Sequence, residues 1–200
     1  MVPVEVDVTL TTAGAHQNAL VVSNYLDLLD QQRETALVAV AGLTEDQIWR
    51  RPGEKEWCIG EVLNHNVRVM ASAMPYARFA WRFFRWYGER NRHKPYRNSI
   101  PDLYRTGNFP MWTGFLWTPR VRPDNRVPLD HLARDLRDLH QAVRDFYTGK
   151  DEDVLGHVSV WDPYFGWLNL ILVLRLGIYH DQLHYEDVLQ LAHSMRPASE

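Results

Sequence analysis

LDHLARDLRDLHQAVRDF, residues 129–146, is the clearest structural pattern in this chain of 200 residues. Pro128 precedes the stretch and Gly149 follows it, as is typical of the start and the end of a helix. Apolar side chains recur within it at spacings of three and four residues, which predicts an amphipathic helix. The apolar stripe consists of Leu129, Leu132, Leu136, Leu139, Val143 and Phe146.

Three other segments have the same helical periodicity: residues 16–41, 56–88 and 166–192. Patterns typical of strands are almost absent, and the alternating stretch at residues 4–9 is too isolated to build a sheet. Four amphipathic helices of this length predict an all-α fold, a four-helix bundle formed by a single domain over residues 1–200.

Two long connections join the predicted helices. Residues 89–127 have no apolar period and contain five prolines, so we expect an irregular insertion between the second and third helices. A connection of this length can carry the chain along the whole bundle, so the two helices that it joins can run parallel. Connections of this length are also often functional lids. Residues 148–165 form the second connection.

Composition narrows the possible partners and compartments. Apolar residues make up 46% of the chain and the net charge is −3, which suits a globular protein without a nucleic-acid partner. The most apolar run, residues 165–178, is shorter than the roughly 20 residues that span a bilayer, so we expect no membrane partner. The single cysteine, Cys58, excludes an internal disulfide and fits the cytoplasm, where we expect it to be a buried, inert thiol.

The fourth predicted helix contains two histidines four residues apart, His180 and His184. Positions i and i+4 stack on one helix face, and apolar residues lie on or beside that face, so both imidazoles are expected to point inward. His65 lies on the apolar face of the second predicted helix, between Val62 and Val69. The sequence therefore predicts that these three histidines share one buried divalent metal ion.

A site of three neutral imidazoles leaves one position open for water or substrate, which is the arrangement of catalytic zinc sites. The alternative is three independent buried histidines, each hydrogen-bonded to a carbonyl or a carboxylate. The remaining histidines lack a partner at ligand spacing, and we expect them on the surface or in loops. They are His16, His93, His131, His140, His157 and His193.

Glu61 lies one helical turn before His65, which makes it the candidate for a catalytic carboxylate or for one that orients an imidazole. The alternative is an ordinary acid that faces solvent. Three aromatic residues of the insertion are candidates for a cover over the open end of the pocket, or for a small separate core. They are Trp112, Phe115 and Trp117.

Residues 76–97 are rich in aromatic side chains and arginines. This segment is a candidate membrane-surface helix or nucleic-acid patch, but we favour an amphipathic end of the second helix that packs on the bundle or on a second subunit. One stripe consists of Phe79, Phe83 and Trp86, and the other of Arg78, Arg82 and Arg85.

Three stretches together resemble the DinB-like (YfiT-like) superfamily of metal-dependent enzymes: GLTEDQIWRRP at 42–52, EWCIGEVLNH at 56–65, and FGW at 165–167 leading to HDQLH at 180–184. In that family one histidine comes from the second helix and an H-x-x-x-H pair from the last long helix. The resemblance thus implies metal ligation by His65, His180 and His184. The insertion at 89–127 is longer than the family leads us to expect.

The resemblance also implies a small-molecule substrate, a homodimer, and one of two reaction classes: hydrolysis, or S-transfer or isomerisation that uses a low-molecular-weight thiol. Imidazole ligands suit zinc, nickel, iron or copper, and we expect zinc or nickel. Two other functions stay open. One is a non-catalytic bundle of stress-response type that binds a metal or a small ligand, and the other is an interaction protein that uses residues 76–97.

Overall fold

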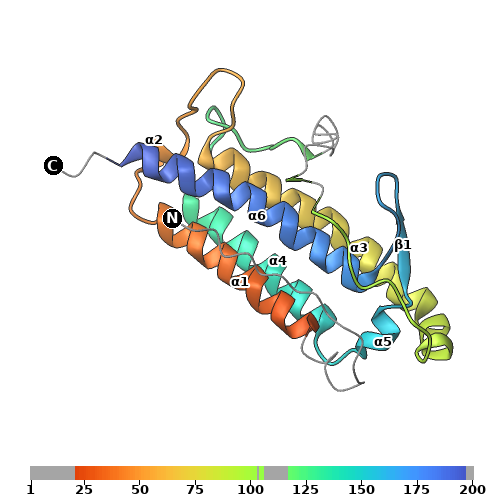
Figure 1. The fold of residues 1–200 in the computed structure, drawn as a ribbon. Coiled ribbons are helices and arrows are strands. Elements are labelled where there is room, and N and C mark those ends of the chain that lie inside the picture. Colours follow the sequence, from red (N-terminus) through yellow and green to blue (C-terminus); the bar gives the residue numbers. More distant parts are fainter. Residues whose placement is uncertain (1–20, 103, 106–116, 197–200) are drawn as a thin grey trace.

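The computed structural model describes residues 21–102, 104, 105 and 117–196. Four long helices form a bundle (Figure 1), which confirms the predicted all-α class. The predicted residues 4–9, His16, Trp112 and Phe115 lie outside the described part. The long helices are α1 (Val21–Val40), α3 (Ile59–Asn91), α4 (Leu129–Tyr147) and α6 (Leu170–Met195).

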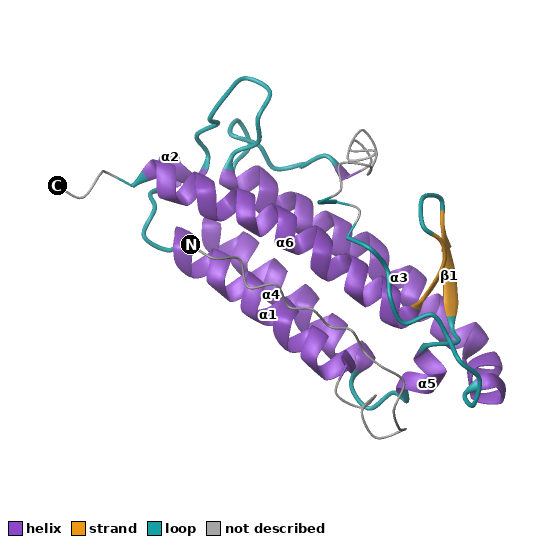
Figure 2. Cartoon of the chain, in the orientation of Figure 1, coloured by secondary structure: helices purple, strands orange, loops and turns teal. Residues whose placement is uncertain are grey.

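Smaller elements join the long helices (Figure 2). Helix α2 (Glu45–Ile48) starts with a capping box in which the Thr44 hydroxyl accepts a hydrogen bond from the Gln47 backbone N–H. The others are helix α5 (Glu152–Leu155) and the strands β1 (Ser159–Asp162) and β2 (Gly166–Asn169). None of the helices in the described ranges is long and apolar enough to cross a membrane.

The β1–β2 hairpin corrects the prediction that the last helix begins at Gly166. The two strands pair antiparallel, and Gly166 takes a positive φ of 71° at the turn, a conformation that favours glycine. Helix α6 begins only at Leu170, because the Asn169 side chain caps it by accepting a hydrogen bond from the Leu172 backbone N–H. The predicted connection 148–165 likewise contains α5 and β1.

The long connection between α3 and α4 lets these two helices run parallel, as the sequence suggested, with α1 and α6 antiparallel to them (Figure 1). Near one end of the bundle, Ile59 at the start of α3 packs in one cluster with Leu132 near the start of α4. Toward the other end, the Lys150 ammonium lies 5.4 Å from the Trp81 ring. Both contacts require the two helices to point the same way.

Two apolar clusters fill the bundle, and a polar layer separates them. The first cluster includes Leu29, Met74, Val143 and Ile178, and the second includes Leu37, Val62, Leu136 and Val188. A third, smaller cluster of Ile100, Leu168 and Leu172 lies where the connection and β2 meet the start of α6. Each fully buried aliphatic side chain contributes about 1.5–3 kcal/mol, so the clusters can support a costly polar layer between them. The buried polar residues of that layer are Arg33, His65, Asn66, His140, His180, Asp181 and His184.

The described part of the connection between α3 and α4 is tied along α3. The Asn64 side-chain oxygen accepts hydrogen bonds from the backbone N–H groups of Arg120 and Val121, at 2.9 and 3.3 Å. The Trp117 indole N–H donates to the Ser72 hydroxyl at 2.7 Å. This part of the insertion, from Trp117 to Val121, therefore lies directly over the part of α3 that contributes to the polar layer.

Candidate metal centre

The structure brings His65, His180 and His184 together in the polar layer. One potential ligand atom from each of them lies within 4.8 Å of those of the other two, and all three residues are buried. The ring centroids are 4.6–5.1 Å apart. Helix α3 supplies one imidazole and α6 supplies the other two, because its 3.6-residue period stacks positions 180 and 184.

Hydrogen bonds on the far side of two rings determine which nitrogens face each other. His65 Nδ1 lies 2.9 Å from the backbone carbonyl oxygen of Trp117, and His180 Nδ1 lies 3.2 Å from Oδ1 of Asp181. Both partners are acceptors, so each Nδ1 carries the proton and donates. In a neutral imidazole the other nitrogen, Nε2, then keeps a lone pair.

The two Nε2 atoms of His65 and His180 lie only 3.1 Å apart. Two facing lone pairs at this distance repel each other unless a proton or a cation lies between them. Two nitrogen ligands at about 2.05 Å from a tetrahedral zinc ion would be roughly 3.3 Å apart. The observed separation is close to that value, so the residues present fit a shared ion.

Burial and mutual repulsion favour the neutral form of His65 and His180. Burial, together with the neighbouring His184 and His180, lowers the pKa of His65 to about 3. Burial also lowers the pKa of His180, against the opposing effect of Asp181. Because metal ions bind the neutral imidazole, a site that disfavours protonation is suited to ligation near neutral pH.

Asp181 links the trio to a fourth histidine. One carboxylate oxygen contacts His180, while Oδ2 lies 3.3 Å from Nε2 of His140 on α4. Burial alone would raise the pKa of the Asp181 carboxyl, but the contacts with His140 and His180 lower it to about 2. A carboxylate that accepts from Nδ1 of a metal-binding histidine fixes the tautomer of that ring and makes it a more basic ligand.

The position of His140 corrects the prediction that it is a surface residue, because it is only 1% exposed. It lies four residues after Leu136 and three before Val143, both buried, so the inward face of α4 includes it. That spacing was visible in the sequence. In contrast, His93, His131 and His193 are exposed, as predicted, and His157 is half-buried.

Aromatic rings from separate parts of the chain lie around the trio. The Trp57 ring centroid is 4.9 Å from that of His65 and 6.4 Å from that of His184. Tyr104, from the long connection, lies 5.8 Å from His180, ring centroid to ring centroid. The connection thus contributes an aromatic wall and, through the Trp117 carbonyl, a partner for His65.

Glu61, the predicted catalytic carboxylate, is 1% exposed and lies at the N-terminus of α3. Its carboxylate accepts hydrogen bonds from the Arg51 guanidinium at 2.9 and 2.5 Å and from the Cys58 backbone N–H at 3.2 Å. Although burial alone would raise it, the pKa of Glu61 is lowered by these partners. The contacts are those of a helix cap, and the catalytic role remains a prediction.

Cys58 is fully buried beside Glu61, with the sulfur 3.3 Å from the carboxylate. Burial raises the pKa of this thiol to about 11, so it stays protonated at neutral pH. These properties agree with the predicted inert cysteine.

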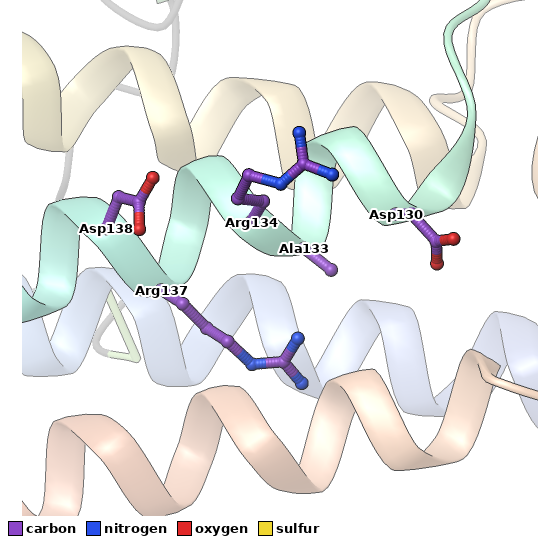
Figure 3. A pocket seen from close by; sticks show the side chains of 5 residues that line it. All are labelled: Asp130, Ala133, Arg134, Arg137 and Asp138. Carbon is purple, nitrogen blue, oxygen red and sulfur yellow. The ribbon is translucent and has the colours of Figure 1, made fainter.

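A surface pocket elsewhere on the bundle is lined by charged side chains of α4 (Figure 3). Its volume is about 330 Å³, and its lining includes none of the three clustered histidines. Arg137 in this pocket is already engaged by Glu34 of α1, at 2.9 and 3.0 Å. We therefore assign the candidate chemistry to the histidine trio. The lining residues are Asp130, Ala133, Arg134, Arg137 and Asp138.

Comparison with known proteins identifies the family of this chain. YfiT from Bacillus subtilis, described as a probable metal-dependent hydrolase with an unusual four-helix bundle topology, has a similar structure with a TM-score of 0.57. The two proteins are 14% identical, and the alignment covers 93% of this chain and 91% of YfiT, so the likeness shows a shared fold. Curated proteins give no match. The profile of the DinB superfamily matches residues 28–188, and the chain therefore belongs to the DinB superfamily.

Proposed function

We propose that this protein is a metal-dependent hydrolase of a small molecule, in which His65, His180 and His184 hold one divalent ion. The observation that carries the proposal is the distance of 3.1 Å between Nε2 of His65 and Nε2 of His180. In both rings the proton is on Nδ1, which donates it to an acceptor on the far side, so the two Nε2 atoms face each other with their lone pairs. A shared cation explains this approach without a buried charged imidazole. The description of YfiT as a probable metal-dependent hydrolase supports the same reaction class.

The trio contributes no negative charge, so a bound divalent ion would keep its full charge and lower the pKa of a bound water toward about 7. The protein's own residues hold the ligands in place. The Trp117 carbonyl orients His65, and Asp181 orients His180. Trp57 and Tyr104 restrict the space beside the imidazoles, which favours a small substrate with an apolar part.

A low-molecular-weight thiol as co-substrate is the second reaction class. A divalent ion that keeps its charge favours a bound thiolate over a thiol, so the same trio can activate an external thiol. Cys58 does not supply such a thiolate, because it is buried and protonated. Zinc or nickel remains the expected metal, and cytoplasmic location remains a prediction from the single cysteine.

Metal content tests the site. Wild-type protein, His65→Ala and His131→Ala would be purified alike and measured by elemental analysis. We expect one equivalent of metal per chain in the wild type and in His131→Ala, whose histidine is exposed, and loss of the metal in His65→Ala. Equal metal content in all three proteins would contradict ligation by His65.

Activity then separates the reaction classes. The zinc-loaded and nickel-loaded protein would be assayed on a panel of esters, amides and lactams, and on electrophiles together with small thiols. Turnover without a thiol that is lost in His65→Ala supports the hydrolase. Turnover only with a thiol supports the transferase or isomerase, and metal binding without turnover supports a non-catalytic bundle.

A further inference from the structure

Among the described residues, nine aromatic side chains are exposed at one end of the molecule. They come from the last part of α3, which at 33 residues outruns α1 and α4, and from the β1–β2 hairpin beside it (Figure 1). Their exposed fractions range from 41% to 70%. The nine are Tyr76, Phe79, Phe83, Phe84, Trp86, Tyr87, Trp161, Tyr164 and Trp167, and we call them the aromatic end.

The aromatic end is larger than the largest apolar patch of an ordinary monomer. Aromatic side chains have areas of about 150–250 Å², so nine that are about half exposed offer roughly 1,000 Å². The largest apolar patch of a typical monomer is about 300–600 Å². A stable protein–protein interface needs about 800 Å² from each partner, and the aromatic end alone supplies that area.

The shape of the aromatic end includes both a groove and a ridge. The groove has a volume of about 540 Å³ and runs between α3 and the hairpin. Phe83 and Trp86 lie outside the groove lining and are 55% and 56% exposed, so they form the adjacent ridge. Phe79 and Tyr87 line the groove and contact the ridge, with ring centroids 4.6 Å from Phe83 and 6.1 Å from Trp86.

A groove and a ridge side by side on one surface are what a two-fold interface requires, because each copy must offer both complementary parts. The composition also fits a protein partner, since Trp, Tyr, Phe and Arg are enriched at interfaces. Arg78, Arg82 and Arg85 are exposed and form no ion pair within the described residues. Helical periodicity puts them beside the ridge, at the rim of such an interface, where water screens like charges.

We propose that the aromatic end is the interface of a two-fold symmetric dimer of this chain. Phe83 and Trp86 of each copy enter the groove of the other copy, next to its Trp161 and Trp167. The proposal does not depend on the metal site. It assigns a surface to the homodimer that the family resemblance implies.

The first test is sedimentation equilibrium over a range of concentrations, on wild type, Trp86→Glu and Val38→Glu. Val38 is 71% exposed on α1, away from the aromatic end, so its variant is the matched control for a new surface charge. We expect a dimer for wild type and Val38→Glu. For Trp86→Glu we expect a dimer Kd that is higher by roughly 30-fold or more, with an unchanged circular dichroism spectrum.

A second test uses the buried position of Cys58, which leaves an introduced cysteine as the accessible thiol. Trp86→Cys and Trp161→Cys chains would be mixed and oxidised, and we expect the mixed disulfide to form in preference to either homodisulfide. A wild-type monomer at every concentration, a dimer insensitive to Trp86→Glu, or no preference for the mixed disulfide would overturn the proposal. So would a wild-type monomer that binds phosphatidylglycerol vesicles through Trp86.

Discussion

Nε2 of His140 lies 3.3 Å from Oδ2 of Asp181, so a buried carboxylate on α6 is held by a histidine from α4 on one side and by His180 on the other. Side-chain exposure is only 1% for His140 and 3% for Asp181. The pair therefore connects the wall of the bundle to the histidine trio without access to solvent.

This relationship predicts that Asp181→Asn weakens zinc binding by roughly 10–100-fold, because the neutral amide makes the His180 ring a less basic ligand. Competition with a chelator of known zinc affinity measures the effect, and the visible spectrum of the cobalt-loaded protein reports the altered ligand field. Asp135→Asn is the control, since Asp135 is exposed on α4. Equal losses in both variants would show that general negative charge, not the contact with His180, holds the metal.

The sequence was sufficient to predict the histidine trio because each part of the argument was local or topological. The i, i+4 spacing of His180 and His184 follows from helix geometry, and the apolar neighbours of His65 indicate its inward direction. Four amphipathic helices around one core then leave little choice about where inward-facing residues meet.

The burial of His140 and the β1–β2 hairpin were not predicted from the sequence. The partner of His140 is distant in sequence, and the pattern of the hairpin strands is ambiguous. The spacing of His140 from Leu136 and Val143 indicated an inward direction, but the partner that makes the burial of a polar ring possible, Asp181, lies far away in the sequence on α6. The hairpin strands are four residues each, too short for a clear alternation, and they pair only across their own turn. The role of Glu61 as a helix cap, in contrast, was indicated locally, because an acidic side chain at the third position of a helix is typical of a capping box.

Zinc should stabilise the metal-free protein if the trio holds an ion. At a free zinc concentration about 100 times the Kd, the free energy of unfolding is expected to rise by about 2.7 kcal/mol. For a chain of this length that corresponds to a rise in Tm of roughly 5–10 °C. Thermal unfolding of chelator-treated protein with and without zinc measures it. His65→Ala should show little or no rise, and an equal rise in that variant would place zinc elsewhere.

Glu61→Gln should destabilise the fold while leaving zinc binding intact. The substitution removes the ion pair with Arg51 and weakens the cap on the Cys58 backbone N–H, so we expect a loss of about 1–3 kcal/mol in unfolding free energy. Urea unfolding and zinc titration give the two readouts, with exposed Glu54→Gln as the control. Wild-type stability combined with a large loss of kcat would instead support the catalytic role.

Two helical glycines should respond in opposite directions to alanine. A Cβ at Gly88 would lie 2.8 Å from the Val154 backbone oxygen, because α5 packs closely on α3 there, so Gly88→Ala should cost about 1–3 kcal/mol. A Cβ at Gly177 in α6 meets nothing within 4 Å, so Gly177→Ala should stabilise by about 0.4–1 kcal/mol. Urea unfolding of both variants measures the difference. A stabilised Gly88→Ala would mean that α3 and α5 separate easily.

Acid should remove the contribution that Glu34 makes to the free energy of unfolding by joining α1 to α4. The side-chain hydrogen bond from Arg137, with a further one from Arg33, lowers the pKa of Glu34 from 4.5 to about 2 in the folded protein. A carboxyl whose folded pKa is lowered stabilises the fold above its unfolded pKa, and this stabilisation disappears as the pH falls from about 4.5 to about 2. Because Glu34 is partly exposed, the contribution is about 0.2–1 kcal/mol. Urea unfolding of wild type and Glu34→Gln across this range should show a gap in stability that closes at the acid end, and two parallel curves would contradict the ion pair.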